Sequence, residues 1–101
     1  MQINTNSFYK MKHGSSSQPI TNKIVNVVFT DNTDQEGFPI YGEVYIIDDN
    51  DDTKYTLPMY WDKNGKCRTK SSAMALQEIS EEEWNQCKEA WNKCSFPLTS
   101  Y

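Results

Sequence analysis

The chain has 101 residues, of which 37% are hydrophobic and 13% aromatic, and its formal net charge is −4 at pH 7. This length suits one domain with one small core, and it leaves few residues to build a deep active site. We therefore expect residues 1–101 to form a single domain, in which the polar segment 1–20 is a loop or arm. No segment has the apolar length of a membrane span, and Met1–Lys12 lacks the apolar centre of a signal peptide. We therefore expect a cytoplasmic protein. In that compartment its three cysteines would be reduced thiols.

Three segments are typical of β-strands because they are rich in β-branched and aromatic residues: 23–30, 40–47 and 53–61. The third places four residues on one face at a period of two: Tyr55, Leu57, Met59 and Trp61. Pro58 removes a backbone donor from that segment, which predicts an edge strand or a bulge. The dipeptide Asn64-Gly65 then predicts a turn and a short returning strand over 66–70, whereas 71–77 is ambiguous.

The sequence Ser80-Glu81-Glu82-Glu83 predicts the start of a helix. In such a capping box the Ser80 hydroxyl accepts from the backbone of Glu83, and the Glu83 carboxylate reaches back. Pro97 limits the helix to about Cys94. The helix has one stripe that we expect to pack on the sheet, with a Trp at its rim as an alternative partner contact: Trp84, Cys87, Trp91 and Cys94. The sequence therefore predicts an α+β domain, with a small antiparallel sheet of three to four strands and one C-terminal amphipathic helix packed on one face.

Charge is unevenly distributed along the chain. Residues 31–58 carry eight carboxylates against Lys54, whereas residues 59–77 carry four cations against Asp62. The carboxylates gather in expected turns, where they can attract a basic protein or imitate the phosphates of nucleic acid. We therefore expect a partner protein to contact seven acidic residues: Asp31, Asp34, Glu36, Asp48, Asp49, Asp51 and Asp52.

A second hypothesis places a small-molecule or nucleotide site around the returning strand. Lys66, Arg68 and Lys70 alternate, so they would share one strand face. Tyr60 and Trp61 precede them and could stack on a base. The candidate ligand-binding residues are Tyr60, Trp61, Lys66 and Arg68. A solvated edge strand protected by its charges explains the same pattern.

The sequence contains no recognisable catalytic or metal-binding motif. His13 is the only histidine of the chain, and the sequence contains no C-x-x-C, no H-E-x-x-H and no glycine-rich phosphate loop. The spacing from Asn32 to Glu43 partly copies a calcium loop, but its flanks are typical of strands, which favours an acidic turn. We therefore expect neither catalysis nor a metal or other cofactor.

The segment Leu57–Cys67, with the sequence LPMYWDKNGKC, resembles a strand–turn–strand found in small phage-encoded accessory proteins. The resemblance implies a protein that acts on a host enzyme or an anti-phage defence system. We therefore expect a non-enzymatic acidic module in the host cytoplasm that binds and inhibits a host protein, with a nucleic-acid-binding enzyme as one candidate. Binding to membranes or directly to nucleic acid is not expected, and self-association through an edge strand is left open.

Overall fold

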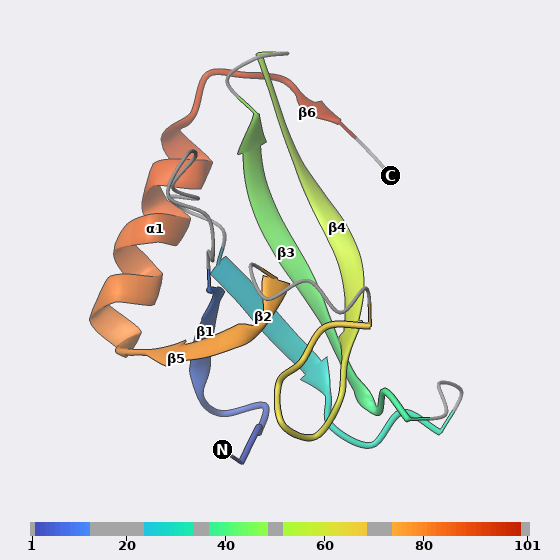
Figure 1. Cartoon of the computed structure of the whole chain (residues 1–101). Helices are drawn as coiled ribbons and strands as arrows, with labels where there is room; N and C mark the ends of the chain where they lie inside the picture. Colours follow the sequence, from blue (N-terminus) through green and yellow to red (C-terminus); the bar gives the residue numbers. More distant parts are fainter. Residues whose placement is uncertain (1, 13–23, 34–36, 49–51, 69–73, 100–101) are drawn as a thin grey trace.

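A computed structural model of the chain describes residues 2–12, 24–33, 37–48, 52–68 and 74–99, which form one sheet and one helix (Figure 1). The elements are β1 (Phe8–Met11), β2 (Ile24–Phe29), β3 (Ile40–Asp48), β4 (Thr53–Trp61), β5 (Leu76–Ile79), α1 (Glu81–Lys93) and β6 (Leu98–Thr99). The order in the sheet is β5-β1-β2-β3-β4-β6. The first five strands are antiparallel, and β6 pairs with β4 in parallel. The α+β class is confirmed, whereas the expected three to four strands were too few.

The strands missing from the sequence prediction are short. β1 and β5 have four residues each, and they pair with each other from Phe8↔Ile79 to Met11↔Leu76. Four residues contain too few periods to show a strand pattern, so only pairing across the chain defines these strands. The expected returning strand over 66–70 is reduced to one bridge between Trp61 and Cys67 among the described residues, and residues 69–70 lie outside them.

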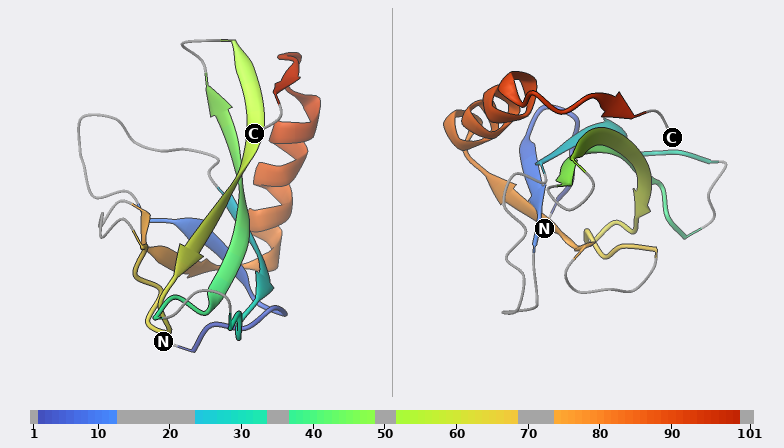
Figure 2. Two further views of the ribbon diagram at one scale, coloured as in Figure 1. Left: turned by 90° about the vertical axis from the view of Figure 1, so that its right-hand side faces the viewer. Right: turned by 90° about the horizontal axis from the view of Figure 1, so that it is seen from above.

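Alternation along the strands divides the sheet into two faces, and we call the face that holds the core the inner face. Its buried cluster consists of Ile3, Tyr9, Met11, Val25, Val27, Ile40, Val44, Ile46, Met59, Trp61, Cys67 and Leu76. The sheet is strongly curved around this core (Figure 2). Tyr55 and Leu57 pack against the cluster that contains Met59 and Trp61, which confirms the predicted common face of β4. The Trp61 indole Nε1 donates a hydrogen bond to the Met74 carbonyl at 2.8 Å, which ties the chain just before β5 to the core.

Gly42 lies on the inner face where two strands and a large ring meet. A Cβ atom at this position would lie 2.8 Å from the Asn26 carbonyl oxygen and 3.2 Å from Cζ3 of Trp61. Both distances are shorter than a normal carbon contact, and the first involves backbone. A glycine here therefore allows β2, β3 and the Trp61 ring to approach closely.

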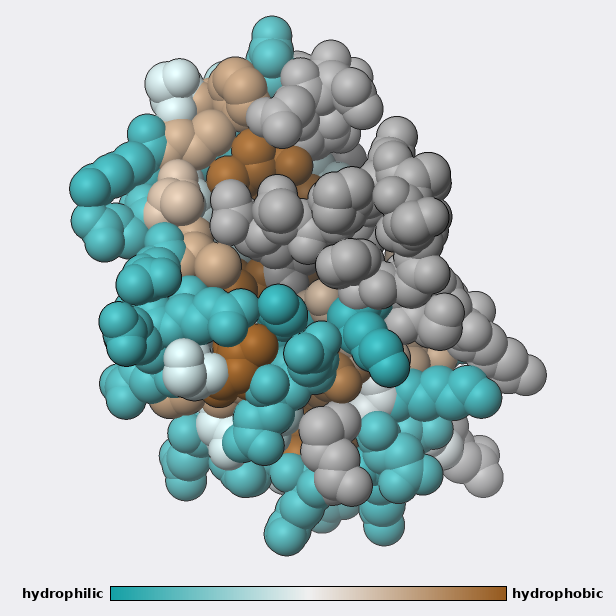
Figure 3. Space-filling model, turned by 60° about the vertical axis from the view of Figure 1, so that its left-hand side comes forward, coloured by the Kyte–Doolittle hydropathy of each residue, from teal (hydrophilic) through white to brown (hydrophobic). Residues whose placement is uncertain are grey.

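Helix α1 packs on the opposite face of the sheet, which we call the outer face. The Trp84 indole donates to the Val25 carbonyl at 3.0 Å, and the Trp91 indole donates to the Ile46 carbonyl at 3.1 Å. Trp84 also contacts Phe8 of β1, with 5.7 Å between ring centroids. The tryptophan stripe therefore packs on the sheet as predicted. Among the described residues on this side of the molecule, hydrophilic side chains alternate with hydrophobic patches (Figure 3).

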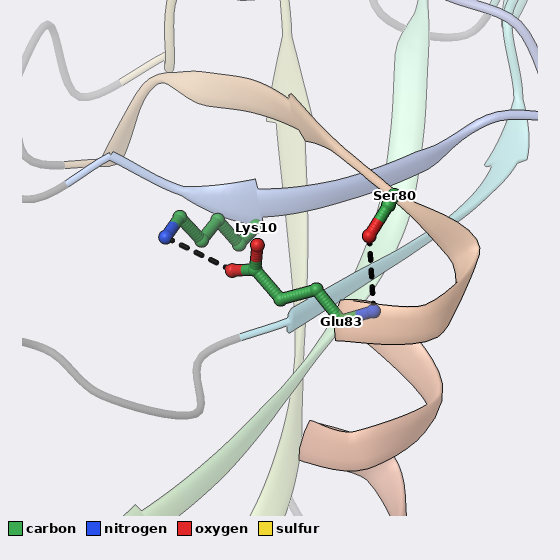
Figure 4. Close-up of polar contacts among 3 residues, drawn as sticks. All are labelled: Lys10, Ser80 and Glu83. Carbon is green, nitrogen blue, oxygen red and sulfur yellow. Dashed lines mark hydrogen bonds and ion pairs between the residues drawn. The ribbon is translucent and has the colours of Figure 1, made fainter.

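The start of α1 is held by two polar contacts (Figure 4). The Ser80 hydroxyl accepts from the Glu83 backbone N–H at 3.1 Å, as the capping box predicts. The Glu83 carboxylate does not reach back to Ser80 but pairs with the ammonium of Lys10 on β1 at 3.2 Å. The helix start is thereby linked to the sheet through a side chain that local sequence cannot identify.

The β3–β4 hairpin extends beyond its neighbour β2. Strand β2 pairs with β3 only as far as Tyr45, whereas β3 and β4 remain paired to Asp48↔Thr53. The C-terminal end of α1 supports this extension, because the Lys54 ammonium donates to the Trp91 carbonyl at 2.9 Å and lies 4.4 Å from the centroid of its ring. The described part of the hairpin beyond β2 is therefore linked to α1 through Lys54.

Candidate partner-binding surfaces

One half of the outer face is not covered by α1. Three rings on adjacent strands form a continuous row there, which we call the aromatic row: Phe29 of β2, Tyr41 of β3 and Tyr60 of β4. The ring centroids are 6.1 Å apart between Phe29 and Tyr41 and 5.1 Å apart between Tyr41 and Tyr60. Phe29 is 55% exposed, whereas Tyr41 and Tyr60 are half-buried. A contiguous row of rings that the helix leaves partly exposed is a candidate binding surface.

A β-bulge places Phe29 in the aromatic row. Simple alternation from Val25 and Val27 would turn Phe29 towards the inner face. The pairing of β2 with β3 shifts between Val27 and Phe29, so Phe29 lies opposite Tyr41 on the outer face. Phe29 and Tyr41 were not predicted as site residues, and no sequence signal marks the bulge that places Phe29 beside Tyr41.

The aromatic row ends at the turn after β4, and we call residues 62–68 the basic turn. The Asp62 carboxylate accepts from the backbone N–H groups of Asn64 and Lys66 at 2.9 Å each, and Gly65 has φ = 84°. These contacts confirm the turn predicted by Asn64-Gly65. The returning chain bonds through the Arg68 N–H to the Tyr60 carbonyl at 3.0 Å.

The structure brings together some of the predicted ligand-binding residues and separates another. The Arg68 guanidinium lies 6.0 Å from the centroid of the Tyr60 ring, at the limit of a cation–π contact. Lys66 is exposed in the same turn. Trp61 is 0% exposed and belongs to the inner-face core, because it follows Tyr60 directly and neighbours in a strand point to opposite faces. One ligand cannot contact both Tyr60 and Trp61.

The two predicted acidic turns lie at opposite ends of the β3–β4 hairpin. Asp31 is exposed beside the Ile40 end, where the Asn32 N–H donates to the Pro39 carbonyl at 2.8 Å. Asp48 and the exposed Asp52, which has φ = 52°, lie at the other end. Nine residues per strand separate these ends by about 26 Å. Asp34, Glu36, Asp49 and Asp51 lie outside the described residues.

An open groove runs between two loops at the Ile40 end of the hairpin. Residues 31–33, 37 and 39 line one side, and residues 62–64 line the other. Its carboxylates are Asp31 and Asp62, and the Asp62 carboxylate already accepts the two backbone bonds of the basic turn. Within the described ranges, no group of three or more His, Cys, Asp or Glu side chains is placed to hold a metal ion.

The three cysteines are free thiols, and two of them, Cys67 and Cys87, lie in environments that do not favour nucleophilic chemistry. Cys67 is buried in the inner-face core, and Cys94 caps the end of α1. Partial burial, with the Glu83 carboxylate adding to it and Lys10 opposing it, raises the pKa of the Cys87 thiol. A raised pKa disfavours the thiolate that would act as a nucleophile. His13 lies outside the described residues.

Comparisons with protein families, with curated proteins and with solved structures found no match to this chain. In the part of the chain that the structure describes, no helix combines the length and apolar character needed to cross a membrane. The geometry of the described residues must therefore support any functional proposal.

Proposed function

We propose that this protein is a non-enzymatic acidic module that binds another protein, in the manner of a phage-encoded inhibitor of a host protein or defence system. The observation that carries the proposal is the extended end of the β3–β4 hairpin, which holds Asp48 and Asp52 beyond β2 and is supported by α1 through Lys54. Carboxylates on a fixed backbone lose little conformational freedom when a partner binds.

Charge supports a partner that is basic where it meets these turns. Residues 31–58 carry eight carboxylates against one lysine, so their local field is strongly negative despite a total charge of only −4. Such a field accelerates encounter with a basic surface and weakens as salt rises. A nucleic-acid-binding enzyme of the host has a surface of that kind and is one candidate partner.

The test is affinity capture from bacterial lysate with the intact chain as bait. Because the acidic turns are far apart, they are neutralised separately. One variant changes Asp48, Asp49, Asp51 and Asp52 to Asn, and the other changes Asp31 and Asp34 to Asn and Glu36 to Gln. A control changes four exposed carboxylates elsewhere, Glu78, Glu81, Glu82 and Glu89, to Gln, which alters the net charge as much as the four-Asp variant.

We expect one stoichiometric protein to be retained by the wild type and the control and lost from the four-Asp variant. Circular dichroism and urea denaturation would show that each variant is folded. Equal capture of that protein by all the variants, at low and at high salt, would exclude the acidic turns as the contact surface.

A second candidate function is the binding of a nucleotide or a related small molecule at Tyr60, Lys66 and Arg68. The observation that favours it is the position of the Arg68 guanidinium over the Tyr60 ring on the uncovered outer face. Isothermal titration with nucleotides should show binding that Arg68→Ala removes. Trp61 fluorescence should not respond, since that ring is buried on the other face. An unaltered titration with Arg68→Ala would exclude this site.

A further inference from the structure

We propose that the aromatic row and the basic turn together bind single-stranded nucleic acid. This inference rests on the second candidate function, ligand binding at Tyr60 and Arg68, and it names the class of ligand. It also departs from the sequence-based expectation that the protein does not bind nucleic acid directly. Phe29 and Tyr41 are far from the cations in the sequence, and the folded sheet brings both rings into line with Tyr60 beside the basic turn.

The aromatic row offers a stacking surface that extends over three strands. Phe29, Tyr41 and Tyr60 lie at paired positions of β2, β3 and β4, with neighbouring ring centroids 6.1 Å and 5.1 Å apart. The unpaired bases of a single strand can stack on such rings, whereas the bases of a duplex are already stacked on each other. A sheet face with exposed rings on adjacent strands is a common way to hold successive bases.

Charge complementarity favours a ligand with anionic groups at the Tyr60 end of the row. The basic turn carries the exposed cations Lys63, Lys66 and Arg68 against the single carboxylate of Asp62. That carboxylate accepts the backbone bonds that shape the turn. The phosphates of a bound strand would therefore lie along the basic turn, away from Glu43, which lies on the outer face on the α1 side of Tyr41.

The shape of the surface favours a strand over a single nucleotide. Sites for small molecules are concave and cover most of the ligand. The aromatic row lies on a sheet face that α1 does not cover, with a 55% exposed phenylalanine at one end and two half-buried tyrosines, so one base would gain a single weak contact. Several connected bases would gain several contacts on the same surface, and three cations suffice for a short run of phosphates.

The experiment measures fluorescence anisotropy of labelled oligothymidylate and oligouridylate of about 12 nucleotides, a length within the usual range of site sizes. A duplex of the same length and a nucleoside monophosphate are compared with them. The intact wild-type chain should bind both single strands more tightly than the duplex or the mononucleotide. With three phosphate contacts, a fourfold rise in salt should weaken binding by about 20-fold.

The variants are Phe29→Ala, Tyr60→Ala and Arg68→Ala, each checked for folding by urea denaturation. Loss of a stacking ring should weaken binding by about fivefold or more. The matched controls are Leu98→Ala, an exposed hydrophobic residue on β6, and Lys93→Ala, an exposed cation on α1, and both should bind like the wild type.

Several outcomes would overturn the inference. The inference is wrong if the wild type binds no single strand at low salt. It is also wrong if Phe29→Ala and Tyr60→Ala bind the single strands as tightly as the wild type does. Binding of a mononucleotide as tight as that of the strand would overturn it while leaving the second candidate function in place. If the protein captured from lysate were instead lost with Phe29→Ala and no oligonucleotide bound, the row would be a protein contact. The four-Asp variant should bind oligonucleotides at least as well as the wild type. Capture from lysate therefore tests the acidic turns, and oligonucleotide binding tests the aromatic row independently.

Discussion

The two halves of the outer sheet face are built from similar residues but have different surroundings. In the covered half, Phe8, Ile24 and Tyr45 lie beneath α1, and Ile24 is 0% exposed. In the uncovered half, Phe29 of β2, Tyr41 of β3 and Tyr60 of β4 lie on the same outer face, where Phe29 is 55% exposed. An aromatic residue on the outer face of this sheet therefore becomes core or surface according to where the helix docks.

The tryptophans of α1 account for this difference. Each indole donates to a strand carbonyl, and Trp84 and Trp91 both contact the Tyr45 ring edge-on, with centroids 6.3 and 5.2 Å away. The Lys88 ammonium adds a cation–π contact, 4.6 Å from the centroid of the Tyr45 ring. We therefore expect the covered half to contribute stability and the uncovered half to be available for binding. Four substitution experiments test that division.

The largest difference should come from Trp91→Ala. Trp91 is 8% exposed and holds both the Ile46 carbonyl and the Lys54 side chain, so its loss should lower the free energy of unfolding by about 3–5 kcal/mol. Phe29→Ala, its counterpart in the uncovered half, should change stability by only about 0.5 kcal/mol. Urea denaturation measures both values. Equal losses would mean that the two halves do not differ as described.

A smaller effect is expected for Trp84→Phe. The change keeps most of the ring contact with Phe8 but removes the indole donor to the Val25 carbonyl. A lost hydrogen bond to a sheet carbonyl should reduce stability by about 1 kcal/mol. Tyr60→Phe removes a polar atom from the uncovered half and should leave the urea midpoint nearly unchanged. A reversed order of the two would contradict the division.

Ser80→Ala should cost about 1 kcal/mol, because the first turn of α1 loses the acceptor of the Glu83 N–H. Ser80→Asp is the matched control, since an aspartate accepts the same bond and should retain most of the stability. Thermal unfolding followed by circular dichroism would show both. No difference between the two variants would mean that the cap does not hold α1 on the sheet.

The smallest effect concerns pH. Burial, with the Glu43 carboxylate adding to it, raises the pKa of Tyr45 above its ordinary value of 10.0. The folded state therefore holds this proton more tightly than the unfolded state, and the stability this contributes is present below pH 10 and is lost as pH rises through the folded pKa. Between about pH 9 and about pH 11, the wild type should lose more unfolding free energy than Tyr45→Phe. Parallel pH profiles would contradict the covered environment of this ring.

The long elements and the turns could be predicted from the sequence. The strands over 24–29, 40–48 and 53–61 have the composition and length that show a strand pattern, and the helix has both a cap and a stop. The turn at Asn64-Gly65 was predictable because few residues tolerate the left-handed conformation that Gly65 adopts. Strands β1, β5 and β6 were not predictable, since two to four residues acquire strand character only through their partners.

The candidate surfaces were predictable only in part. Lys66 and Arg68 were identified by alternation and Tyr60 by its place just before them, and Arg68 does lie over Tyr60. Trp61 was included because it is adjacent in sequence, and alternation turns it into the core. Phe29 was missed because the bulge reverses its face, and no residue pattern marks that bulge.

The sequence specifies the three long strands, both ends of the helix and the uneven spread of charge, because these features depend on neighbouring residues. Only the tertiary structure decided that Glu83 pairs with Lys10, that the acidic turns lie at opposite ends of one hairpin, and that Phe29 joins Tyr41 and Tyr60 on an uncovered face. These features depend on strand pairing and on where α1 docks, and such contacts join residues that are far apart in the chain.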